Sequence, residues 1–279
     1  MRQFFALSLA AVALGATAQV AEVPWTVREE RTPIHADPDR TSPQRGELLQ
    51  GEAVSGEIVR NPETDEEWLA FASSGETWHV TTNDLIRVHP VNLAEGDLPI
   101  GEEIVTRWWA LRPDYEPSDL VGIPPAWCSD ADREHRLRLE SMESLVAMFQ
   151  AARRDGVEIR VTSAYRSFES QRRNFRNAVR RLGPGERQVA RPGHSEHQLG
   201  TTVDLVDPEG RHVLELSFGT TPQWRWLNEH AASFGWRQSY TEANTAETGY
   251  DPEPWHFRHF GQPATAEAVS SASPEIASD

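Results

Sequence analysis

The chain of 279 residues contains no lysine and a single cysteine, Cys128. One cysteine excludes an intramolecular disulfide and any metal site built on several thiolates. All 27 basic residues are arginines, and 43 acidic residues outnumber them, which gives a formal net charge of −16. This acidity argues against nucleic acid or an anionic membrane surface as the main partner.

Long apolar runs are also absent after the first residues of the chain. Residues 1–18 combine one positive charge, an apolar run and an Ala-x-Ala ending at Ala18. This combination is typical of a secretory signal peptide cut after Ala18, and a buried N-terminal helix is the alternative. No later stretch is long and apolar enough for a membrane span. The sequence therefore predicts an exported protein.

Residues 23–90 alternate between brief apolar runs and turn-forming residues such as Asn61-Pro62 and Ser74-Gly75. This pattern predicts about five short strands in a small all-β barrel. Two of the runs, 67–71 and 76–80, are expected to pair with each other. The segment resembles the SH3-like modules that bacteria attach to cell-wall enzymes, although a spacer without any ligand fits equally well.

A polar stretch at 91–101 is expected to link this barrel to a second domain at 102–262. The small, acidic residues of 263–279 predict a disordered tail. The second domain mixes helices and short strands without a βαβ repeat, which predicts an α+β fold. One of its helices is expected to end near Asp155-Gly156, with these residues on its apolar face: Met142, Leu145, Phe149 and Ala152.

The most informative stretch runs from Ser195 to Asp204 and reads Ser-Glu-His-Gln-Leu-Gly-Thr-Thr-Val-Asp. Its imidazole, His197, lies in a turn, and Asp204 lies in a segment that alternates like a short strand. Gly200 between them lets the backbone reverse tightly. Further on, Glu253-Pro-Trp-His256 adds a second imidazole and a spare carboxylate. A catalytic zinc requires such a set, with three protein ligands and a fourth position for water.

These motifs, with Ser-Ala-Tyr-Arg-Ser at 163–167 and Glu-Pro-Trp-His-x-Arg at 253–258, resemble the VanY-type zinc D-Ala-D-Ala carboxypeptidases. That family also includes L,D-carboxypeptidases that trim peptidoglycan stem peptides. The resemblance extends from about residue 107 to residue 261. It implies a hedgehog/DD-peptidase-like zinc peptidase fold for 102–262, preceded by the SH3-like barrel.

The resemblance also implies a role for each site residue. Zn²⁺ is expected to be bound by His197, Asp204 and His256. Glu253 is expected to act as the general base and Arg166 to stabilise the oxyanion. A further group of residues is expected to contact the substrate: Ser195, Gln171 and Trp255.

The predicted function is removal of a C-terminal D-alanine from peptidoglycan stem peptides in the periplasm or cell wall. Two alternatives stay open. One is an endopeptidase that cuts within peptidoglycan cross-links, and the other is a wall-binding protein whose zinc site is inert. Intact Glu253 and Arg166 argue against the second. The sequence leaves open whether the bond that is cut is of the D,D or the L,D type.

Overall fold

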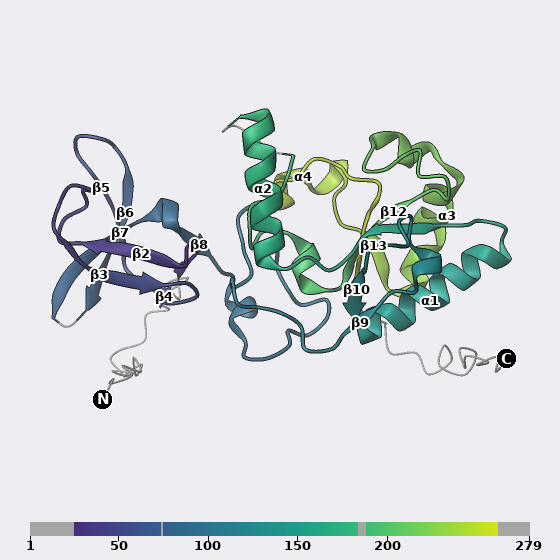
Figure 1. The fold of residues 1–279 in the computed structure, drawn as a ribbon, viewed down its shortest axis with the longest axis horizontal. Helices are drawn as coiled ribbons and strands as arrows, with labels where there is room; N and C mark the ends of the chain where they lie inside the picture. The colour runs from purple at the N-terminus through teal and green to yellow at the C-terminus, as the bar shows by residue number, and fades with distance from the viewer. Residues whose placement is uncertain (1–24, 74, 184–187, 262–279) are drawn as a thin grey trace.

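The computed structural model of the protein describes residues 25–73, 75–183 and 188–261. The expected signal peptide, 1–18, and the expected tail, 263–279, lie outside these residues. The described part has one group of strands before residue 88 and a second group, with the α-helices, after residue 119 (Figure 1). Across the described residues, every helix is too short or too polar to cross a membrane.

The N-terminal strands form two antiparallel sheets. The larger sheet has the order β3-β2-β7-β6-β5, and the smaller has the order β4-β1-β8. The expected pairing of 67–71 with 76–80 is confirmed, because β6 and β7 form a hairpin in which Phe71 lies opposite Trp78. The strands are β1 (Trp25–Val27), β2 (Arg31–His35), β3 (Gln44–Leu49), β4 (Ala53–Val54), β5 (Glu57–Arg60), β6 (Glu67–Ser73), β7 (Glu76–Thr81) and β8 (Leu85–Arg87).

The barrel expected for 23–90 is not confirmed, because the described strands do not close on themselves. Strands β3 and β5 are the outer edges of the larger sheet. Strand β2 joins β7 through a single residue pair, His35 with His79, and a register shift interrupts its pairing with β3 just before His35. Alternating apolar residues predict strands, but barrel closure also depends on strand tilt and register. The sequence pattern does not specify either of these.

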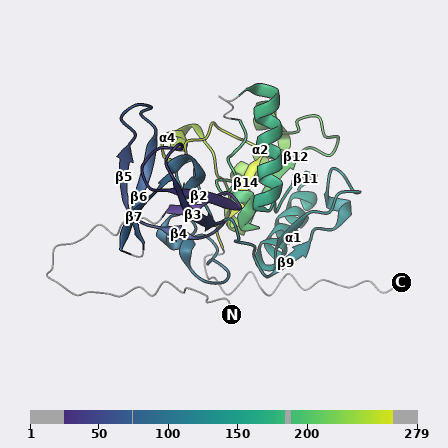
Figure 2. The ribbon, with the colours of Figure 1, turned by 60° about the vertical axis from the view of Figure 1, so that its left-hand side comes forward.

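Residues 88–118 connect the two groups of strands and pack against both. Val88 pairs with Ala110, and the two lie in one apolar cluster with Ile86 of β8 and Phe168 of α2. In the segment expected to be a linker, 91–101, the Leu98 side chain is 1% exposed. Figures 1 and 2 show α2 on the side of the C-terminal part that faces the N-terminal strands. The segment is thus partly buried, while the domain boundaries themselves stay a prediction.

The C-terminal part combines an antiparallel sheet, of order β11-β12-β14-β13, with packed helices. This arrangement confirms a mixed α+β fold. A separate two-stranded ribbon is formed by β9 (Leu120–Gly122) and β10 (Arg136–Arg138). The sheet strands are β11 (Arg160–Ser163), β12 (Thr202–Val206), β13 (Trp236–Gln238) and β14 (His256–His259). The α-helices are α1 (Leu139–Arg154), α2 (Phe168–Leu182), α3 (Pro222–His230) and α4 (Thr245–Thr248).

Helix α1 supplies much of the core beside this sheet. The residues expected on its apolar face are all buried: Met142, Leu145, Phe149 and Ala152. The helix ends at Arg154, and Gly156 follows with a φ of 77°, a conformation that glycine adopts without strain. The 3₁₀ turns are η1 (Thr82–Asp84), η2 (Pro90–Leu93), η3 (Pro125–Trp127), η4 (Glu196–Leu199), η5 (Leu216–Thr220), η6 (Ala231–Phe234) and η7 (Glu242–Asn244).

Candidate metal centre and active site

Three side chains from separate elements converge at the sheet. His197 lies in η4, Asp204 in the middle of β12, and His256 at the start of β14. Asp204 and His256 are direct partners in the register of β12 and β14. One ligand atom from each of the three buried residues lies within 4.8 Å of the others. The two imidazoles and the carboxylate therefore have the spacing that a single metal ion requires.

Gly200 makes the tight reversal between η4 and β12. Its φ is 72°, in the left-handed region. A Cβ atom at this position would lie 2.9 Å from Leu120 Cδ2 and 3.0 Å from Arg138 Cγ. The reversal places His197 and Asp204 side by side, with His197 Nε2 at 3.1 Å from Asp204 Oδ2.

In both imidazoles, the nitrogen that faces away from Asp204 contacts an oxygen that accepts a hydrogen bond. His197 Nδ1 lies 2.7 Å from the Ala164 carbonyl oxygen, which leaves Nε2 to face Asp204. His256 Nε2 lies 3.0 Å from Glu196 Oε2, and its Nδ1 lies 3.1 Å from Asp204 Oδ1. Since a carbonyl or carboxylate oxygen only accepts, the contacts to Ala164 and Glu196 place a proton on the outer nitrogen of each ring and leave the other nitrogen facing Asp204.

The charges around the centre suit a cation. Burial acts to raise the pKa of the Asp204 carboxyl, but His197 and His256 outweigh it and hold that pKa well below its ordinary value. Burial opposes the charge on His256, yet hydrogen bonds to Asp204 and Glu196 raise its pKa to about 10. Two imidazoles and one carboxylate match the preferred donors of Zn²⁺, so these residues fit the expected metal.

Glu253 lies next to the cluster without belonging to it. Its backbone N–H donates to the Tyr240 carbonyl at 3.1 Å, and its Oε2 lies 3.5 Å from His256 Nδ1. The side chain is 25% exposed, so solvent reaches it. Burial is the main cause that raises the pKa of the Glu253 carboxyl to about 7. A carboxyl with this pKa both accepts and donates a proton near neutral pH.

Arg166 brings a positive charge close to the cluster. Its Nη1 donates to Gln171 Oε1 at 2.7 Å, and its Nη2 donates to Ser163 Oγ at 2.9 Å. Nη2 also lies 4.0 Å from Asp204 Oδ2. In the described part of the chain, the buried Nε has no hydrogen-bond partner. The guanidinium is therefore fixed in orientation and keeps donors for a further group.

The three expected substrate contacts lie in different environments. Gln171 is buried, and its amide Nε2 donates to the Ala190 carbonyl at 2.7 Å while its oxygen accepts from Arg166. Ser195 is buried directly before η4. Trp255 is partly buried and packs against the core of the C-terminal part. Ser195 and Trp255 thus lie close to ligands in the chain, whereas Gln171 is linked to the site through Arg166 and already uses both ends of its amide.

Sequence reasoning assigned no role to three other residues of the site. Glu196 and Arg258 form an ion pair of 2.9 Å behind His256, and Arg258 pairs with Glu103 at 2.8 Å. Glu196 lies within the motif at 195–204, and Arg258 is the last residue of the motif at 253–258. These two residues could therefore have been identified as site residues from the motifs. Nothing in the sequence around Glu103 pointed to the site.

His194 is a further buried histidine of this region. Its Nδ1 lies 2.9 Å from the Thr106 carbonyl oxygen, and burial lowers its pKa to about 4. In the unfolded chain the histidine takes up a proton near pH 6.5. Between these two pH values only the unfolded state gains the proton, so acidification removes stability.

We therefore expect His194→Gln to reduce the loss of stability on acidification. Glutamine can still donate to Thr106 but does not titrate. From pH 7 to pH 4.5, the free energy of unfolding of the variant should fall by about 2 to 3 kcal/mol less than that of the wild type. Urea unfolding of both proteins in excess chelator measures this difference. Equal losses in the two proteins would show that His194 is not the group responsible.

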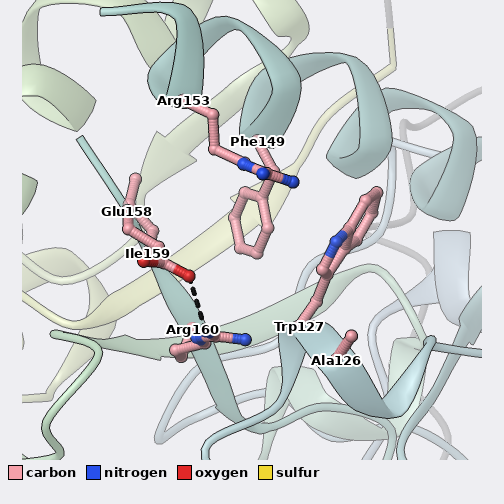
Figure 3. A pocket seen from close by; sticks show the side chains of 7 residues that line it. All are labelled: Ala126, Trp127, Phe149, Arg153, Glu158, Ile159 and Arg160. Carbon is pink, nitrogen blue, oxygen red and sulfur yellow. Dashed lines mark hydrogen bonds and ion pairs between the residues drawn. The ribbon is translucent and has the colours of Figure 1, made fainter. Parts of the chain in front are cut away.

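A separate cavity of about 240 Å³ opens on the C-terminal part. Figure 3 shows the Trp127 and Phe149 rings on its walls and the Arg160 guanidinium paired with Glu158. None of the residues around it belongs to the His-Asp-His cluster. They come from η3, from the second half of α1, from the residues just before β11 and from the start of β11. We assign no role to this cavity.

Comparison with known proteins covers most of the C-terminal part. Residues 134–262 match the protein family described as VanY: D-alanyl-D-alanine carboxypeptidase. The solved structure of the LdcB LD-carboxypeptidase is 35% identical in sequence and superposes with a TM-score of 0.53. The alignment covers 57% of this chain and 76% of the LdcB chain. The chain belongs to the VanY family.

Other proteins are also similar to this chain. YodJ of Bacillus subtilis (strain 168), a carboxypeptidase by name, is 35% identical over 58% of this chain and 60% of its own length. A D-alanyl-D-alanine carboxypeptidase of Enterococcus faecalis (strain ATCC 700802 / V583) is 36% identical over 45% of this chain and 49% of its own. The chain thus spans about half to three-fifths of these relatives. A solved VanY D,D-pentapeptidase in complex with Zn(II) is 30% identical, covers 57% of this chain and 86% of its own, and has a TM-score of 0.45.

The expected zinc cofactor fits this chain, since its described residues include a His-Asp-His cluster with the donors that Zn²⁺ prefers. The VanY region, 134–262, contains every site residue expected from the sequence. Glu103 lies upstream of that region, although its carboxylate is part of the network behind His256.

Proposed function

We propose that this VanY-family chain is an exported, zinc-dependent carboxypeptidase that removes a C-terminal D-alanine from peptidoglycan stem peptides. The observation that carries the proposal is the convergence of a three-ligand cluster with a carboxylate, Glu253, and a guanidinium, Arg166. Such a set provides a metal, a proton-transfer group and an oxyanion partner around one point. The names of its relatives support the substrate class, since they include D,D- and LD-carboxypeptidases.

His197, Asp204 and His256 would hold the zinc ion through the inward-facing atoms described above. A zinc ion bound there supplies a water of lowered pKa and a Lewis acid for the scissile carbonyl. The hydrogen bonds that the outer ring N–H groups donate to the Ala164 carbonyl and the Glu196 carboxylate keep both imidazoles in the tautomer that a metal needs.

Glu253 would transfer the protons of the reaction. Its carboxylate lies 3.5 Å from a ligand nitrogen and reaches solvent, so a water beside the ligands is within its range. As a base it takes a proton from the attacking water, and as an acid it then gives that proton to the leaving amine. Since Glu253 is outside the ligand set, it stays free to move the proton.

Arg166 would stabilise the oxyanion that develops on the scissile carbonyl. Gln171 and Ser163 fix its orientation before substrate arrives, so no reorganisation is needed during the reaction. Ser195 and Trp255 are proposed to contact the substrate terminus. The engaged amide of Gln171 favours a part in holding Arg166 over direct substrate binding.

The remaining parts of the proposal concern location and organisation. Export is supported by the signal-like residues 1–18, and it places the enzyme in the periplasm or cell wall with its substrate. We also propose that 23–90 and 102–262 are two domains, because each contains its own sheet and its own apolar core.

Mass spectrometry of defined stem peptides tests this function. The zinc-loaded protein is incubated with a tetrapeptide and a pentapeptide stem, with excess chelator in parallel. Loss of one D-alanine from the pentapeptide alone indicates D,D-carboxypeptidase activity, and loss from the tetrapeptide alone indicates L,D activity. Internal cleavage of a cross-linked dimer without release of D-alanine would instead identify an endopeptidase.

The metal assignment makes a prediction of its own. His197→Ala removes one of three ligands, so we expect purified protein to lose most of its zinc, whereas the wild type should bind one zinc per chain. Elemental analysis measures this. His212→Ala is the matched control, since His212 lies in the loop after β12 and bonds to Ser217 rather than to the cluster. Unaltered zinc content in His197→Ala would refute the ligand set.

A further inference from the structure

Strand β14 places an imidazole and a guanidinium on the same side of the sheet. His256 and Arg258 are two residues apart, and side chains at this spacing in a strand share a face. Phe257 between them points the opposite way, into the main apolar core. Arg258 is 3% exposed, so its charge is buried beneath the ligand histidine.

Glu196 connects these two side chains. Its Oε2 lies 3.0 Å from His256 Nε2, and its Oε1 accepts from Arg258 Nη1 at 2.9 Å. The Glu196 side chain is 6% exposed. Because one oxygen is bound by the arginine, the carboxylate cannot rotate without losing a buried ion pair. The contact to His256 is therefore held at a fixed angle.

Glu103 continues the network from outside the VanY region. Its Oε2 accepts from Arg258 Nη2 at 2.8 Å, and its backbone carbonyl accepts from the same nitrogen at 3.0 Å. The Gly101 N–H donates to the same Oε2 at 2.7 Å. With its side chain 1% exposed, Glu103 is the most buried member of the network.

Gly101 allows this upstream segment to approach β14. A Cβ atom there would lie 2.4 Å from the Phe260 carbonyl oxygen, and the residue has a φ of 93°. A side chain at this position would push the segment away from the end of β14. The close approach of this segment to the end of β14 therefore depends on a glycine two residues before Glu103.

We infer that Glu103, Arg258 and Glu196 form a positioning relay that holds His256 in the orientation and tautomer required for metal binding. This inference rests on the proposed zinc site and adds three residues that act through His256. A buried ion pair gives little stability compared with apolar residues of the same volume. Here the ion-pair network ends on His256, a proposed zinc ligand, and this contact gives the network a function. A carboxylate hydrogen-bonded to the outer nitrogen of a ligand histidine fixes the tautomer of the ring and raises its basicity as a ligand.

The relay predicts weaker zinc binding when its most remote member loses its charge. Glu103→Gln keeps the shape of the side chain, touches no ligand, and is expected to lower the zinc affinity about 10- to 100-fold. Competition with a chromophoric chelator measures the affinity, and the visible spectrum of the Co²⁺-substituted protein should shift with it. Glu102→Gln is the matched control, because Glu102 is adjacent, exposed and expected to retain wild-type values.

The outcomes separate this inference from the proposed function. A folded Glu103→Gln protein with wild-type zinc affinity and Co²⁺ spectrum overturns the relay. If Glu103→Gln does not fold, ¹⁵N spectra of the histidines in the wild type decide: a hydrogen-bonded Nε2–H on His256 supports the relay, and its absence overturns it. A wild-type protein that binds no zinc refutes the proposed zinc site, and the same histidine signal in the metal-free protein still tests the relay.

Discussion

Glu253→Ala is expected to keep its zinc and to lose hydrolysis by about 10²- to 10⁴-fold in kcat. The ligands remain in place, since Glu253 contributes no atom to the His-Asp-His cluster. What is lost is the carboxylate 3.5 Å from His256 Nδ1, which we propose takes the proton of the attacking water. Steady-state release of D-alanine and elemental analysis of the same preparation measure the two properties together.

Asp251→Ala provides the control for this variant. Asp251 is exposed, lies two residues away and carries the same charge, so its removal should leave turnover and zinc content at wild-type values. Cleavage by Glu253→Ala at a rate close to that of the wild type would show that another group is the base. Loss of zinc from Glu253→Ala would show that this residue is a ligand instead.

Arg166→Lys is expected to lower kcat by about 10²-fold or more although the charge is kept. The guanidinium is held by two hydrogen bonds, to Gln171 and Ser163, and still presents donors toward the cluster. An ammonium group has no planar fork, so it cannot keep both contacts and also meet the oxyanion. KM should change much less than kcat if the lost contact forms mainly in the transition state.

The control for Arg166→Lys is Arg173→Lys on the exposed side of α2. It makes the same chemical change away from the cluster and should have wild-type kinetics. Zinc content should be unchanged in both variants. If Arg166→Lys turns over substrate with little loss, the oxyanion must be stabilised by other groups.

The candidate site was accessible from the sequence because its residues are concentrated in short motifs. His197 and Asp204 are seven residues apart across one glycine turn, and Glu253 and His256 are three residues apart. Local conformation therefore brings each pair together. The pairing of β12 with β14, which sets Asp204 opposite His256, needed the fold. The family resemblance, and not the periodicity of these strands, supplied that step.

The sequence could not predict features that depend on contacts between residues far apart in the chain. Glu103 meets Arg258 only because residues far apart in the chain pack together at Gly101 and Phe260. No local pattern around Glu103 distinguishes it from its exposed neighbour Glu102. The barrel expected for 23–90 is not confirmed for a similar reason, since closure depends on register between strands. Helix α1, whose apolar face from Met142 to Ala152 is periodic over about three turns, was the kind of element that sequence predicts best.

The most direct test of the central claim compares one stem peptide in two forms, with a free and with an amidated C-terminus. A carboxypeptidase recognises the terminal carboxylate, whereas an endopeptidase must leave room for chain beyond the cut. Mass spectrometry of the zinc-loaded wild type should show release of D-alanine from the free peptide and none from the amidated one, with no release in excess chelator. Equal turnover of the two forms would contradict the account.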